Sequence, residues 1–121
     1  MTTFSQTFYD CDNITEVPEG LFANCPDVTS FNSTFDSCSN LIVIPVNIFD
    51  NNRKVVDFYE CFNGCSRLEG ESPYTEIGGI RYHLYERKNN AEQFITPTSM
   101  YQAFRHCSNL TDYSNIPTDW K

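Results

Sequence analysis

The chain has 121 residues, of which 40% are hydrophobic and 15% aromatic, and this apolar content excludes a disordered chain. The net charge of −8 argues against nucleic acid as the main partner, because an acidic surface repels phosphate groups. No apolar run approaches the roughly 18 residues that span a bilayer, so we expect no membrane insertion. The length favours a single domain over residues 1–121.

A repeat of 27 residues begins at the N-terminus. Residues 4–14, 31–41 and 58–68 align without gaps, each with Phe in the first and fifth positions and Cys in the eighth. A fourth copy, at residues 104–110, lies 42 residues after the third. So many coincidences at one offset indicate a repeat protein. We expect units at about 1–27, 28–54, 55–99 and 100–121, with an insertion at about 71–99 and a capping role for the last unit.

The pattern within each unit predicts a short helix and short strands. Phe31, Phe35 and Cys38 are spaced i, i+4 and i+7, which places them on one face of a short helix. The apolar residues 41–44, three of which are β-branched, predict a short buried strand. One unit is too small to hold a core, so we expect stacked units to align equivalent residues into structural ladders. The ladder positions are Phe8, Phe35, Phe62 and Phe104, and Cys11, Cys38, Cys65 and Cys107.

Four of the six cysteines therefore occupy one equivalent position. Residues in a ladder point the same way, whereas a disulfide needs Cβ atoms that point toward each other. We expect these four to be buried thiols that pack as small apolar residues. Cys25 and Cys61 lie outside the ladder, and a bridge from Cys61 to Cys25 or Cys65 is one alternative. A structural zinc site at Cys61-x-x-x-Cys65 is another, but no second pair of ligands lies close by, so we expect no metal.

These repeats resemble the bacterial BspA-like leucine-rich-repeat surface proteins. Residues 17–22, 28–31 and 107–121 carry the resemblance, which covers roughly 1–70 and 100–121. It implies an α/β repeat fold, a leucine-rich-repeat-like solenoid of about four turns with short parallel strands and short helices. It also implies a cell-surface, secreted or virion-tail location, and it supplies no catalytic residues. The chain departs from the family in its sparse leucine and in the interrupted third unit.

The start of the chain lies inside a repeat. Residues 1–4 are in register with 28–31, and Met1 stands where the next unit has Val. These residues have neither the basic region nor the apolar segment of a signal peptide. Because stacked repeats need terminal caps, we expect a further N-terminal domain of the same polypeptide. A partner that covers the first unit is the alternative.

The insertion is the main candidate for a binding surface. Residues 74–77 and 80–85 flank Gly78-Gly79, a pattern that predicts a β-hairpin, and a polar loop follows at 86–90. Insertions in repeat proteins map to one face, often the binding face, and Tyr and Arg are enriched in interface centres. The alternative is a hairpin that caps the third unit, with Tyr side chains that only pack. The candidate ligand-binding residues are Tyr74, Arg81, Tyr82, His83, Tyr85, Arg87 and Lys88.

Motifs for catalysis are missing from the sequence. His106 precedes Cys107, but adjacent residues of a helix face different directions. There is no G-x-S-x-G, H-E-x-x-H or phosphate-cradling glycine loop, and Asp10-x-Asp12-Asn13 lacks the glycine and distal glutamate of a calcium loop. We expect no enzymatic activity and no cofactor. The predicted function is a recognition or adhesion module that binds a protein or a glycan at a bacterial surface or on a phage tail. The alternative is a structural spacer or assembly module of a larger surface or tail protein.

Overall fold

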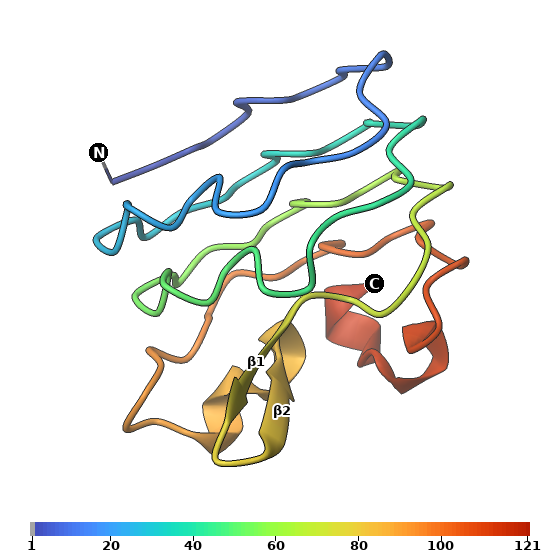
Figure 1. Cartoon of the computed structure of the whole chain (residues 1–121). Coiled ribbons are helices and arrows are strands. Elements are labelled where there is room, and N and C mark those ends of the chain that lie inside the picture. The colour runs from blue at the N-terminus through green and yellow to red at the C-terminus, as the bar shows by residue number, and fades with distance from the viewer. Residues whose placement is uncertain (1) are drawn as a thin grey trace.

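The regular elements of the chain lie in its second half (Figure 1). The computed structural model describes residues 2–121. Met1, which the repeat aligns with Val28, lies outside the described residues. The strands β1 (Tyr74–Ile77) and β2 (Ile80–His83) are followed by the 3-10 helices η1 (Leu84–Asn89), η2 (Tyr113–Asn115) and η3 (Thr118–Trp120). None of the helices within residues 2–121 is long and apolar enough to cross a membrane.

The β1–β2 hairpin lies where the sequence predicts it. Tyr74 pairs with His83 and Ile77 pairs with Ile80 in an antiparallel register. Gly78 and Gly79 have φ values of 59° and 81°, a left-handed conformation that glycine adopts without steric cost and that a tight hairpin turn requires. The second strand ends at His83, because residues 84–89 turn into η1.

The prediction of a leucine-rich-repeat-like solenoid with short parallel strands and short helices is wrong. Within residues 2–121 the one sheet has two antiparallel strands, and the longest helix, η1, has six residues. The backbone gives the reason, because Ser33 and Ser37 have φ values of 54° and 63° and a right-handed helix needs negative φ throughout. Residues 31–38 therefore form successive turns. The same positive φ recurs at equivalent positions, namely Gln6, Asp10, Glu60, Gly64, Gln102 and His106.

Adjacent units contact each other through backbone hydrogen bonds and isolated bridges. Ser30 forms single parallel bridges with Thr3 and with Asp57, 27 residues before and after it. Alternate amides donate to the next unit, as Phe35 N does to Cys61 O at 2.8 Å. The amides between them close turns within their own unit. Figure 1 shows these chain passes side by side, from the blue N-terminal end toward the hairpin and the red C-terminal segment.

Phenylalanine rings at equivalent positions form a continuous stack through the core. Phe35 lies 5.3 Å from Phe8 and 5.2 Å from Phe62 between ring centroids, and Phe104 follows Phe62 at 5.5 Å. All three ring pairs are within 9° of parallel. Phe35, Phe62 and Phe104 are fully buried, whereas Phe8 at the N-terminal end is half-buried. Trp120 in η3 covers the last ring at 6.4 Å, so the C-terminal segment closes this end of the core.

The six cysteines, all within the described residues, are free thiols, and no bridge joins Cys61 to Cys25 or Cys65. Three ladder thiols each donate to a Phe carbonyl of the preceding unit: Cys38 to Phe8, Cys65 to Phe35 and Cys107 to Phe62, at 2.9, 3.1 and 3.0 Å. Cys11 has the equivalent position in the first unit and is only partly buried. Burial raises the pKa of Cys38 to about 11 and of Cys107 to about 12. These thiols therefore stay protonated at neutral pH and satisfy backbone acceptors inside the core.

Candidate ligand-binding site

The seven candidate residues of the insertion do not form one open surface, and Arg87 is the most deeply buried of them. Its side chain is 1% exposed and donates to Asn52 O at 2.7 Å and to Phe49 O at 2.9 Å. The guanidinium lies 4.5 Å from the centroid of the Phe94 ring. Burial lowers the pKa of Arg87 to about 9, which leaves it charged at neutral pH. Arg87 thus anchors η1 to residues 49–52, and its charge does not face a ligand.

Two further candidates, Arg81 and His83, already contact carboxylates next to the hairpin. His83 Nε2 lies 2.6 Å from a Glu71 oxygen, and His83 Nδ1 contacts Glu86. Carboxylates only accept, so the ring needs protons on both nitrogens to donate to both at once. Arg81 pairs with Glu71 at 3.1 Å and its guanidinium lies 4.7 Å from the centre of the Tyr74 ring. A ligand on this face would have to compete with contacts that the hairpin already makes.

The remaining candidates, Tyr82, Tyr85 and Lys88, differ in burial. Tyr85 is buried and donates to Asp112 at 3.0 Å, and burial with the nearby Asp112 charge raises its pKa. Tyr82 is half-buried and packs 6.0 Å from Phe94. Lys88 is exposed and lines a cavity, so it is the member of the set that a ligand in that cavity would meet.

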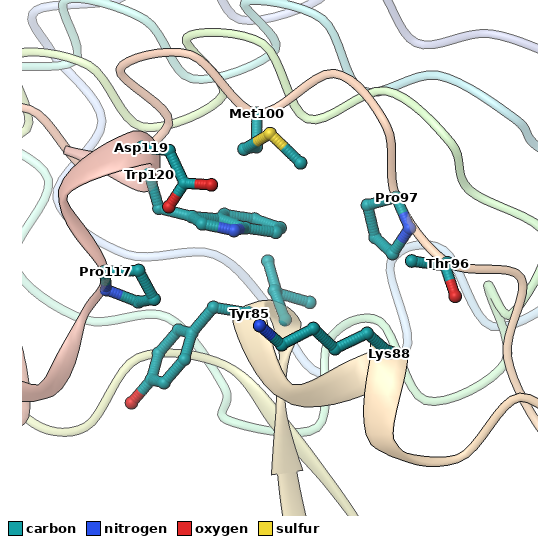
Figure 2. Close-up of a pocket in the computed structure, with 9 residues that line it drawn as sticks. Tyr85, Lys88, Thr96, Pro97, Met100, Pro117, Asp119 and Trp120 are labelled. Carbon is teal, nitrogen blue, oxygen red and sulfur yellow. The ribbon is translucent and has the colours of Figure 1, made fainter.

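This cavity of about 70 Å³, the tryptophan pocket, lies where the insertion meets the C-terminal segment (Figure 2). In the view of Figure 2, the Trp120 ring lies at the centre with Met100 above it and Lys88 below it. Trp120 is 5% exposed, and its indole forms a wall of the pocket. Apolar and charged groups are mixed in the lining, which includes Leu84, Lys88, Pro97, Met100, Asp119 and Trp120.

A wider and more open hollow of about 490 Å³, the tyrosine groove, adjoins this pocket. Met100 and Asp119 line both hollows, so the two are adjacent. The Tyr101 ring is 58% exposed, and it stacks on Tyr59 with centroids 5.9 Å apart and planes 28° apart. Tyr59 therefore packs against the Tyr101 ring, while more than half of the Tyr101 surface stays exposed to solvent. The lining of the groove includes Tyr59, Ser99, Met100, Tyr101, Thr118 and Asp119.

The backbone of the repeat places the two tyrosines side by side. Tyr59 and Tyr101 occupy equivalent positions, and Glu60 N donates to Tyr101 O at 3.0 Å across the two units. Positive φ at the following residues, Glu60 and Gln102, turns the chain after each tyrosine. A hydrogen bond with Glu60 and its negative charge raise the pKa of Tyr59, which therefore remains a neutral phenol. The groove is thus a largely apolar, aromatic surface, and main-chain contacts between the two units hold its tyrosines side by side.

The η3 helix brings Trp120 to the pocket. Trp120 N donates to Pro117 O at 3.0 Å and closes the helical turn. Trp120 O accepts a hydrogen bond from Phe104 N at 2.8 Å, which ties η3 to the fourth unit. The indole therefore has the buried Phe104 ring on one side and the pocket on another.

Sequence reasoning named Lys88 and Tyr85 of the pocket lining and missed Trp120, Met100 and Tyr101. The equivalence of Tyr59 and Tyr101, 42 residues apart, was the one signal in the sequence that pointed to the groove. Within residues 2–121, no three His, Cys, Asp or Glu side chains are grouped so that they hold a metal ion.

No family model, curated protein or solved structure matches the chain. The resemblance to BspA-like proteins therefore rests on the repeat residues alone. The structure overturns the leucine-rich-repeat solenoid that the resemblance implied. The cell-surface, secreted or virion-tail location stays a prediction.

Proposed function

We propose that the protein is a non-catalytic recognition module that binds a protein or a glycan through the tyrosine groove and the tryptophan pocket. Tyr101 carries the proposal, because its exposed side chain lines a hollow and stacks on Tyr59, whereas a single exposed tyrosine on a flat surface is ordinary. Ligand sites are concave, mostly apolar and furnished with a few polar groups, and the groove volume of about 490 Å³ falls within their usual range.

Tyrosine suits this role for physical reasons. It offers a large contact area, a hydroxyl and only two rotatable side-chain bonds, so that little entropy is lost on binding. The Gln102 amide donates to the Tyr101 hydroxyl at 3.3 Å, and Tyr59 supports one ring face. The ring is therefore partly ordered before a ligand arrives, which lowers the cost of association.

The test compares native protein with Tyr101→Ala on an array of defined glycans and on a displayed library of short peptides. We expect at least one probe to bind the native protein and to lose about thirtyfold in affinity in the variant, the usual effect of removing a central interface tyrosine. Tyr9→Ala is the matched control, because Tyr9 is 50% exposed in the first unit and lies outside the groove lining. This control should bind as the native protein does.

Two results would contradict the proposal. One is a native protein that binds none of the glycans or peptides, which would favour the structural spacer. The other is a bound probe whose affinity is the same in Tyr101→Ala, which would place the site elsewhere. Because Tyr101 is mostly exposed, we expect the variant to melt within a few degrees of the native protein, as surface substitutions usually do.

A further inference from the structure

The size of the tryptophan pocket limits what it admits. A dry cavity of about 150 Å³ in another protein accommodates benzene, which has six heavy atoms. By this measure the pocket, at about 70 Å³, holds about three heavy atoms. A sugar ring or a large side chain does not fit, whereas an acetyl group, with two carbons and one oxygen, does.

The lining of the pocket suits the acetyl group of an amide. Trp120, Met100 and Pro97 supply apolar walls for a methyl group. Lys88 can only donate hydrogen bonds, and Asp119 can only accept them. An amide has one carbonyl acceptor and one N–H donor, so the two charged residues match the two polar groups of an acetamide.

The groove indicates what the acetamide is attached to. Tyr101 is more than half exposed, and a tyrosine ring has a negative π-face, which attracts weakly positive C–H groups such as those of a sugar ring. Ser99 and Thr118 add hydroxyls to the groove. Because Met100 and Asp119 line both hollows, a ring on Tyr101 lies next to the pocket that would receive its substituent.

Charge favours the same class of ligand. The chain has a net charge of −8, which disfavours phosphorylated or otherwise strongly anionic ligands. An acetamido sugar is neutral, so it enters without this penalty.

We infer that the site binds a glycan that carries an N-acetylated amino sugar, with the sugar ring on Tyr101 and the acetyl group in the tryptophan pocket. The inference rests on the proposed function and names its ligand class. An acetylated lysine on a protein has the same acetamide, but it has a flexible alkyl chain in place of a ring. The aromatic surface beside the pocket favours the sugar.

Trp120 is the single tryptophan of the chain, so its fluorescence reports directly on the pocket. The full chain is titrated with a β1,4-linked trisaccharide of N-acetylglucosamine, with its deacetylated counterpart and with the corresponding glucose trisaccharide. We expect the acetylated trisaccharide to change the Trp120 emission and to bind at least about tenfold more tightly than the other two. Tyr101→Ala and Lys88→Ala should each weaken binding of the acetylated trisaccharide. Lys54→Ala should leave it unchanged, since Lys54 pairs with Asp27 outside both hollows.

Each other outcome overturns the inference in a recognisable way. Equal affinity for the three saccharides, lost in Tyr101→Ala, would rule out the acetyl group and leave the recognition function intact. Tighter binding of an acetyl-lysine peptide than of the acetylated trisaccharide would replace the glycan by a modified protein. Failure of all these probes to bind would overturn the ligand class, while the function itself would still be judged by the wider arrays.

Discussion

Replacing Arg87 by methionine tests whether the insertion is held to the rest of the fold by a buried cation. The guanidinium donates to the carbonyls of Phe49 and Asn52, which come 35 to 38 residues earlier in the chain. Methionine keeps much of the side-chain volume against the Phe94 ring but removes every donor. The variant therefore isolates the hydrogen bonds from the packing.

The magnitude follows from two opposing contributions. Within the described residues, Asn52 O loses its donor, at a cost of about 1–3 kcal/mol, whereas Phe49 O keeps a hydrogen bond from Asn52 N and loses only the bond from Arg87, worth about 0.5–1.5 kcal/mol. Against this, the Arg87 Nε has no hydrogen-bond partner within the described residues, and removing the buried charge relieves part of its desolvation. We expect a net loss of about 2 kcal/mol in the free energy of unfolding. For a chain of 121 residues this lowers the melting temperature by about 8 °C.

The assay is thermal and urea denaturation of Arg87→Met followed by circular dichroism. Arg67→Met is the control, because Arg67 is exposed and loses the same charge, and its free energy of unfolding should change by less than about 0.5 kcal/mol. A native melting temperature in Arg87→Met, or a higher one, would refute the reasoning. It would mean that desolvation of the guanidinium outweighs its hydrogen bonds.

Three further predictions concern the core. Phe35→Ala, which opens a gap between the Phe8 and Phe62 rings, should cost about 3–5 kcal/mol, and a urea midpoint that barely moves would contradict the stacked core. The buried thiol of Cys107 should react with a thiol reagent only after unfolding, and fast labelling of the native protein would show that it is accessible. Its pKa of about 12, raised by burial from 9.0, favours the protonated form in the folded state, so stability should fall as the pH rises from 9 to 12. This thiol contributes about 1.4 kcal/mol per pH unit in that range, and Cys107→Ala should show a correspondingly shallower fall.

The sequence by itself determined which residues are equivalent and where the hairpin lies. The 27-residue offset identified the Phe positions that stack, because a repeated pattern of apolar residues is visible without coordinates. The Gly78-Gly79 pair located the hairpin turn, since few other residues adopt its φ angles without strain. One signal is periodic and the other is local, so both can be recognised from the sequence without the structure.

Only the tertiary structure determined the backbone conformation between the Phe positions. The spacing of Phe31, Phe35 and Cys38 suits a helix, but the same spacing also suits a run of turns in which every second amide faces the next unit. Positive φ at Ser33 and Ser37 selects the turns. Serine has no strong intrinsic preference for positive φ, so the sequence does not reveal this conformation. Hydrogen bonds to residues about 27 positions away stabilise it.

Long-range packing likewise determined which candidate residues are buried and which line a cavity. Arg87 looked like an interface residue because it lies in a polar stretch, yet carbonyls from residues 49–52 bury it. The tryptophan pocket draws its lining from three separate stretches, at 84–88, 96–100 and 117–120. No local pattern links such stretches, because a cavity forms only where distant segments pack against each other and leave a space between them.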